Sequence, residues 1–242
     1  MAAPFLLLDE LAAVAPVTAN RTALAGTSAA NVVKHEPGLV YRCADSAPSS
    51  FVDFVIDGGR VFTWDTVAVL GTNQRSGDLV SVYADPSDPQ VPVDLDRLVI
   101  PAVANVKSPA YPTPMKIVKT IATPRADRYF RVRLIVGPTA LPEGYHQCGT
   151  IIIGRRFSFD FDMDVSASSF LVDPSPVFEG PGFADYQPMQ PRTGWRVTFS
   201  WIPENKWWEF VSLFRTVGQS GMVLFVPEPD QPERFHETVA FG

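Results

Sequence analysis

Residues 128–136 read RYFRVRLIV, a stretch in which large apolar side chains alternate with a second set rich in arginine. Successive side chains of an extended chain point to opposite faces. The apolar face holds Phe130, Val132, Leu134 and Val136, and the other face holds Tyr129, Arg131, Arg133 and Ile135. This alternation predicts a β-strand with one face in a hydrophobic core and the other toward solvent.

Further strand patterns lie on both sides of this stretch and end at turn signals. Runs rich in β-branched and aromatic residues occupy residues 51–56, 64–70, 79–83, 115–121 and 149–154. Asp-Gly-Gly at 57–59 and Gly-Thr-Asn at 71–73 predict turns, and residues 91–114 predict a proline-broken loop with short extended pieces. Short strands and turns without helices favour an antiparallel β-sandwich.

A second unit is predicted to begin near residue 155. Residues 156–165 (RFSFDFDMDV) alternate strictly, and strands are predicted at 195–201 and 222–226. Between them, residues 204–217 predict the one amphipathic helix, preceded by Pro203 and ended by Gly218. Its apolar stripe consists of Trp207, Phe210, Val211, Phe214 and Val217. We expect a small sheet with this helix packed on it.

Trp207 and Trp208 are neighbours on the predicted helix. Consecutive helical residues lie about 100° apart, so the two side chains rarely face one core. We expect one to pack inside and the other to lie at an edge or in a subunit interface, where tryptophan is enriched.

The chain of 242 residues therefore divides into three parts. Residues 1–50 are predicted to be irregular, residues 51–154 to form the sandwich, and residues 155–242 to form the β-rich unit with one helix. The run Phe5–Leu8 is no secretory signal, because no Lys or Arg precedes it and acidic residues follow directly. No stretch has the length of a membrane span.

Composition argues against a nucleic-acid binder. The chain carries 20 basic and 26 acidic residues, a net charge of −6, without a basic stripe. The 23 prolines work against long helices and suit shaped loops. Cys43 and Cys148 form no CxxC unit, so two buried free thiols are favoured, and a disulfide between them stays an alternative.

No pattern of residues in the sequence indicates a catalytic, cofactor-binding or metal site. Asp160, Asp162 and Asp164 stand at every second position, but the calcium loop's turn glycine and distal glutamate are missing. We interpret them as an acidic strand face that contacts a basic partner. The histidines, His35, His146 and His236, are scattered and predicted to be loop or packing residues.

Three stretches between about residue 45 and residue 154 resemble the galactose-binding-like, discoidin-type jelly rolls found in phage virion proteins. They are residues 64–73 (WDTVAVLGTN), 128–134 (RYFRVRL) and 149–154 (GTIIIG). In that family the first is a core strand leading into a Gly-x-Asn turn, the second an arginine-containing alternation, and the third a core strand. The resemblance implies a jelly-roll fold for residues 51–154.

Residues 192–242 are similar to tail-tip proteins of siphophages and gene transfer agents. The similar features are the strand at 195–201, the helix at 206–217, the turn and strand at 218–230, and Arg-Phe-x-Glu at 234–237. They imply a non-enzymatic structural protein of a phage tail tip or baseplate, made in the host cytoplasm and located in the virion. Symmetric copies would contact tail tube, distal tail or hub proteins.

Two other hypotheses remain open. A carbohydrate-binding module for attachment to a host-surface glycan would use aromatic contacts, with Trp64 and Tyr83 as candidates, although packing in the core is the favoured interpretation of both. A β-rich hydrolase with dispersed catalytic residues is the third hypothesis.

Overall fold

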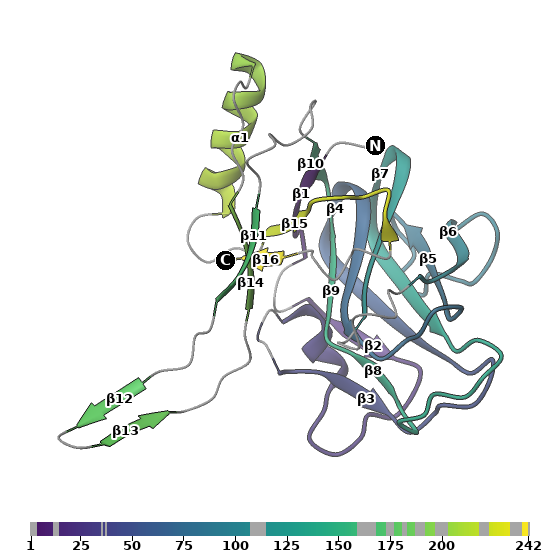
Figure 1. Ribbon diagram of the computed structural model, residues 1–242. Helices are drawn as coiled ribbons and strands as arrows, with labels where there is room; N and C mark the ends of the chain where they lie inside the picture. Colours follow the sequence, from purple (N-terminus) through teal and green to yellow (C-terminus); the bar gives the residue numbers. More distant parts are fainter. Residues whose placement is uncertain are drawn as a thin grey trace.

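The computed structural model describes residues 4–11, 15–34, 36, 38–106, 115–158, 168–172, 177–180, 183–186, 192–196, 203–217, 223–232 and 239–241. In this part the chain is mainly β, with antiparallel strand pairs and one α-helix (Figure 1). A β-sandwich is joined to a smaller sheet on which the helix packs, so the predicted fold class is confirmed. The placing of domain boundaries at residues 50 and 154 stays a prediction.

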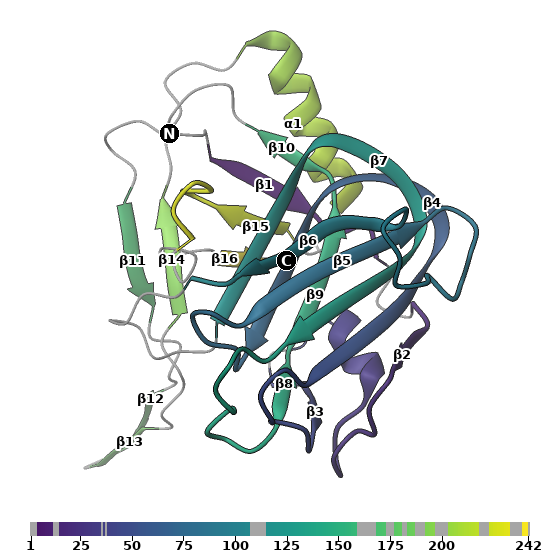
Figure 2. The same cartoon turned by 90° about the vertical axis from the view of Figure 1, so that its right-hand side faces the viewer.

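The sandwich is built around two long strands, β4 (Phe51–Thr72) and β7 (Met115–Ile135). Their pairing shifts register between Asp57 and Phe62, and both strands arch over together beyond the sheet (Figure 2). The first half of β4 lies between β7 and the short strand β2, whereas its second half pairs with β7 and with β9. One ribbon therefore contributes to both layers of the sandwich.

The paired strands β4 and β7 differ from two of the predictions. Residues 57–59 were expected to be a turn, but the strand continues through them as a bulge, in which Gly59 takes a φ of +75° that glycine accepts without strain. Residues 115–121 and 128–136 were expected to be separate strands, but 115–121 and 128–135 belong to the single strand β7. A bulge and a turn share the same residue types, so the sequence pattern does not distinguish them.

Shorter elements complete the sandwich. The six-stranded sheet has the order β2-β4-β7-β5-β6 with β9 beside β4, and β3 pairs with β8 separately. The proline-broken region 91–114 contains β6 at the sheet edge, where Pro101 is tolerated. The bounds are β2 (Val17–Ala19), η1 (Ala29–Val33), β3 (Tyr41–Cys43), β5 (Leu79–Asp85), β6 (Leu98–Ala104), β8 (His146–Cys148) and β9 (Thr150–Gly154).

The alternation in residues 128–136 is confirmed. Phe130, Val132 and Leu134 are fully buried in the core. On the outer face, the Arg131 and Arg133 guanidinium groups donate hydrogen bonds of 2.6–3.0 Å to the carboxylate of Asp53 on β4. Opposite faces of one strand therefore carry the core and an ion-pair cluster.

Residues 1–50 were predicted to be irregular. The structure instead describes three strands and the 3-10 helix η1 among them. The first of these strands, β1 (Phe5–Leu8), belongs to the second sheet, whose order is β10-β1-β15-β16. Its Phe5 and Leu7 are buried against residues of β4, β7, β9 and β15. The prediction failed because the partners of β1 come from distant parts of the chain.

A close backbone approach joins this second sheet to the sandwich. At the end of β9, a Cβ on Gly154 would lie 1.8 Å from the carbonyl oxygen of Leu8, so only glycine fits there. The Leu8 N–H donates a 3.4 Å hydrogen bond to the carbonyl of Arg155. The chain therefore enters and leaves the sandwich at one place. The remaining strands of this sheet are β10 (Arg156–Ser158), β15 (Val223–Val226) and β16 (Val239–Phe241).

The predicted helix is confirmed as α1 (Glu204–Val217). Phe210 and Leu213 pack against a cluster of Leu6, Val223 and Phe225 on the second sheet. The side chains of Phe214 and Val217, expected in the stripe, lie outside the described part. Trp207 and Trp208 are 47% and 57% exposed, so the expectation that one packs inside is wrong.

Short strands also lie in residues 166–192, a stretch that contains several prolines and glycines. β11 pairs with β14, and β12 pairs with β13 in a hairpin that both views show away from the sandwich (Figures 1 and 2). The predicted strands at 156–165 and 195–201 are described only as far as β10 and β14, so Asp160, Asp162 and Asp164 lie outside the described residues. The bounds are β11 (Ser168–Val172), β12 (Val177–Gly180), β13 (Phe183–Tyr186) and β14 (Arg192–Arg196).

Candidate functional site

The end of β4 and the end of β7 bring several loops together at one end of the sandwich. Ile135 pairs with both Phe51 and Leu79, which places the segment after β7 next to the segment before β5. We call residues 42, 73–78, 105 and 136–147 the loop end. Side chains of this region make several hydrogen bonds between loops that are distant in the sequence.

Asp78 organises the backbone of the loop end. Its carboxylate accepts hydrogen bonds from the N–H groups of Arg75 (2.6 Å) and Gly137 (2.7 Å), and its side chain is only 3% exposed. Its carbonyl accepts a 2.7 Å bond from the N–H of Asn105. One buried acidic residue therefore joins three loops.

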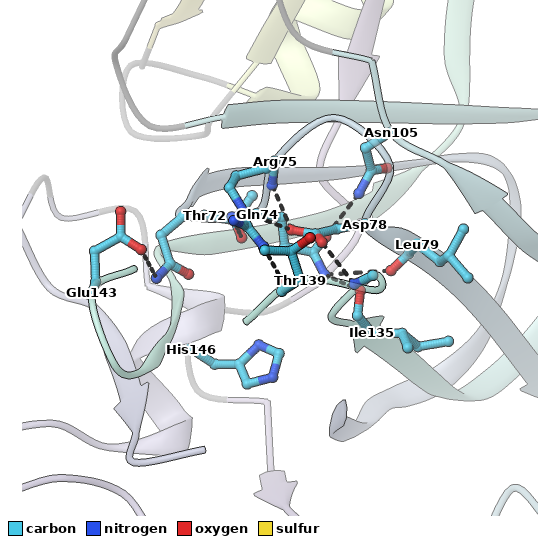
Figure 3. A network of polar contacts seen from close by, with 12 residues as sticks. Thr72, Gln74, Arg75, Asp78, Leu79, Asn105, Ile135, Thr139, Glu143 and His146 are labelled. Carbon is cyan, nitrogen blue, oxygen red and sulfur yellow. Dashed lines mark hydrogen bonds and ion pairs between the residues drawn. The ribbon is translucent and has the colours of Figure 1, made fainter. Parts of the chain in front are cut away.

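Gln74 is a second buried residue that connects the loops, and its side chain is 1% exposed. Its side-chain amide donates to the carbonyls of Leu79 (3.3 Å) and Ile135 (3.2 Å) and accepts a 2.8 Å bond from the Asn105 amide. Figure 3 shows Arg75, Asp78 and Asn105 gathered around it. Buried hydrogen bonds of this kind hold the loops together, while the Asn105 Oδ1 has no hydrogen-bond partner among the described residues.

A set of polar side chains is presented toward solvent on this rigid base. The Asn73 amide donates to the carbonyl of Tyr145 (2.7 Å) and to the Glu143 carboxylate (3.5 Å), and its oxygen accepts from the N–H of Gln147 (2.8 Å). The Arg42 guanidinium donates to the Gln147 side chain (2.9 Å) and lies 5.0 Å from the centre of the Tyr145 ring. Amide, carboxylate, guanidinium and aromatic groups thus adjoin each other.

Arg75 adds a second guanidinium to this end. It donates to the carbonyl of Thr139, and its Nε lies 3.9 Å from the Asp78 carboxylate. Its side chain remains 34% exposed, so part of the guanidinium is available for a ligand.

His146 lies beneath the loop end and is 1% exposed. Its Nε2 is 3.4 Å from the Ser50 hydroxyl, and its Nδ1 has no hydrogen-bond partner among the described residues. Burial lowers the pKa of the imidazole. The interpretation of His146 as a packing residue is confirmed, while His35 and His236 lie outside the described residues.

The two aromatic residues named as candidate sugar contacts are part of the core. Trp64 is fully buried and its indole N–H donates a 2.8 Å bond to Asp127, and Tyr83 is 9% exposed. Neither presents a ring face to a ligand, so the packing interpretation of both is correct.

Cys43 and Cys148 are buried free thiols, as favoured from the sequence. Burial raises the pKa of both groups, which keeps them protonated at neutral pH. Within the described residues, no three His, Cys, Asp or Glu side chains gather closely enough to hold a metal ion. No helix in that same part has the length and apolar character needed to cross a bilayer.

Sequence reasoning missed most of the loop end. Of its polar residues, Asn73 was named from the sequence as the last residue of the Gly-Thr-Asn turn, and His146 as a loop or packing residue. Arg42, Glu143, Tyr145 and Gln147 lie in segments without hydrophobic periodicity, and nothing local indicates that they meet.

No protein-family model and no curated protein matches this chain. Solved structures with a similar arrangement include a family 32 carbohydrate-binding module of Clostridium perfringens NanJ in complex with galactose (10% identity, TM-score 0.44, 62% of this chain and 98% of the module). A chitosan-binding module from a Paenibacillus sp. IK-5 chitosanase/glucanase is 14% identical (TM-score 0.40, 60% of this chain, 97% of the module). A further module, CBM32-3 from a family 31 glycoside hydrolase of Clostridium perfringens, is 10% identical (TM-score 0.45, 61% of this chain, 94% of the module).

Proposed function

We propose that this protein is a non-catalytic carbohydrate-binding protein and that the loop end holds the glycan. The observation that carries the proposal is the side-chain cluster of Asn73, Glu143 and Tyr145, held together by hydrogen bonds from Asn73. Sugar hydroxyls both donate and accept, so an amide can pair with them in both ways and a carboxylate can accept from them. The partly exposed Tyr145 ring adds an apolar surface for the C–H groups of a pyranose.

Rigidity supports the same proposal. Asp78 and Gln74 hold the loops through buried hydrogen bonds before any ligand arrives. Binding then costs little conformational entropy, which favours recognition of small polar ligands.

The chemistry at the loop end favours binding over hydrolysis. Glycoside hydrolysis generally uses two carboxyl groups on either side of the bond that breaks. Within the loop end, Glu143 is the one exposed carboxylate, because Asp78 is buried and fully engaged with backbone N–H groups.

A glycan array followed by calorimetric titration of the full chain tests this proposal. Tyr145→Ala should weaken binding to a glycan found on the array by about tenfold or more. Tyr129→Ala is the matched control, because Arg128 lies 4.8 Å from that ring on the outer sheet face, away from the loop end. Absence of any glycan ligand, or equal binding by Tyr145→Ala and the wild type, would refute the proposal.

The hairpin of β12 and β13 favours a second candidate, a structural component of a phage tail tip that carries its glycan site on the particle. Among the described residues these strands pair only with each other, and an isolated two-stranded hairpin is marginally stable in water. A neighbouring copy or another tail protein would supply the missing packing surface. Antibody-labelled electron microscopy of virions tests this candidate, and label on the capsid or on no particle would rule it out.

A further inference from the structure

A cleft of about 740 Å³ lies between α1 and the sandwich. Its lining comes from α1, β10, the end of β1, β4 and β7, together with Glu10 and with Arg155 between β9 and β10, so both sheets contribute to it. Its volume falls within the range of about 300–1,000 Å³ typical of small-molecule sites. It lies apart from the loop end, since the two share no residue.

The acidic groups of the cleft are all neutralised within the protein. Asp65 is paired with Arg156 (3.5 Å) and also accepts a 2.9 Å hydrogen bond from the N–H of that residue. Glu10 is paired with Arg60 at 2.7 Å, and Glu209 with Lys206 at 3.2 Å. The lining therefore carries no uncompensated negative charge.

Arg155 is the cation of the lining whose guanidinium contacts no described acceptor. Its backbone carbonyl accepts the bond from Leu8, but its exposed side chain makes no hydrogen bond or ion pair with any residue of the described part. An arginine in this situation offers two parallel N–H donors that match a carboxylate.

Trp208 supplies a flat apolar surface in the same cleft. It is 57% exposed and lines the cleft, and no ring contact engages it among the described residues. The neighbouring Trp207 differs, because its ring stacks on Phe210 with centroids 6.1 Å apart and an interplanar angle of 29°. Trp207 is also absent from the lining.

We infer that this cleft is a second binding site and that it takes an acidic sugar residue of the uronic acid class. The sugar carboxylate pairs with Arg155, and the C–H face of its ring stacks on the indole of Trp208. A neutral sugar would leave the cation unpaired, and a small anion without a ring would leave the indole uncovered. The inference concerns a site outside the loop end and stands independently of the function proposed there.

Titrations of the full chain with D-glucuronate, D-glucose and acetate, followed by the chemical shifts of the indole N–H groups, test this inference. D-Glucuronate should bind about tenfold or more tightly than either other probe, and the Trp208 indole resonance should shift. Arg155→Ala and Trp208→Ala should each reduce that affinity by a similar factor of about ten. Circular dichroism of both variants verifies that these exposed side chains were replaced without unfolding.

Two matched variants serve as controls. Trp207→Ala removes an exposed tryptophan from the same helix, and Tyr145→Ala alters only the loop end, so both should bind D-glucuronate like the wild type. Equal affinity for D-glucose or acetate overturns the inference. So does unchanged binding by Arg155→Ala or Trp208→Ala, or a loss of binding in Trp207→Ala or Tyr145→Ala as large as in those two variants.

Discussion

The carboxylate of Asp78 accepts a 2.7 Å hydrogen bond from the backbone N–H of Gly137, 59 positions later in the chain. The same carboxylate accepts from the N–H of Arg75, so one side chain spans two loops. Both loops carry groups of the proposed glycan site, which makes the fold of this end and its binding depend on one residue.

Asp78→Ala should lower the free energy of unfolding by about 2–6 kcal/mol, because two N–H groups lose their acceptor, each at about 1–3 kcal/mol. Urea unfolding followed by circular dichroism measures this change. Asp96→Ala is the control, since Asp96 is exposed and should change stability by less than about 0.5 kcal/mol. Equal stability of the two variants would show that Asp78 does not hold the loops.

Leu7→Ala should destabilise the protein by about 2–5 kcal/mol, because Leu7 is fully buried between the sandwich and the second sheet. Leu95→Ala provides the comparison, since Leu95 is 85% exposed and its loss leaves no cavity. Thermal and urea unfolding measure both variants. A small effect of Leu7→Ala would mean that the N-terminal strand is not part of a shared core.

Stability should fall as the pH drops below 6.5, partly through His146. Burial holds the pKa of the folded imidazole below its ordinary value of 6.5, so in this window the unfolded chain binds more protons than the folded protein. The free energy of unfolding contributed by this group therefore decreases on acidification, by at most about 1.4 kcal/mol per pH unit. Urea unfolding from about pH 7.5 to about pH 5 should show a shallower slope for His146→Gln than for the wild type. Equal pH slopes of the free energy of unfolding in the two proteins would contradict the assignment of this pH dependence to His146.

Native protein should not react with Ellman's reagent at about pH 8, where an exposed thiol of ordinary pKa reacts readily. Cys43 and Cys148 are buried, and burial raises the pKa of each thiol, so neither accessibility nor thiolate character favours reaction. Unfolding in urea should expose two reactive thiols. Reaction of the folded protein, or fewer than two thiols after unfolding, would mean that one cysteine is accessible or that a disulfide exists.

Local periodicity accounts for what the sequence could predict. The alternation at residues 128–136 depends only on neighbouring residues, and the structure confirms which side chains face the core. The helix bounds 204–217 were also predictable, since proline and glycine flank an apolar stripe. The exposure of Trp208 was not, because it depends on where the second sheet ends.

The candidate site could not be predicted, because its contacts join residues that are far apart in the sequence. Asn73 meets the carbonyl of Tyr145 across 72 positions of the chain, and Arg42 meets Gln147 across 105. Neither contact leaves a periodic or motif-like trace. The strand β1 poses the same difficulty, because four apolar residues followed by acidic ones do not indicate which strand lies beside them.

The position of β1 has a consequence for the order of synthesis. This strand is translated before the sandwich, whereas its neighbour β15 is translated after it. During translation, Phe5 and Leu7 therefore lack their contact with β15 while the sandwich, which lies between β1 and β15 in the sequence, can already fold. The chain enters the sandwich after Leu8 and leaves it at Arg155, so its two connections to the second sheet lie side by side. Because Ala68, Val118 and Ile152 of the sandwich cover Phe5 and Leu7, the second sheet depends on the sandwich for part of its core.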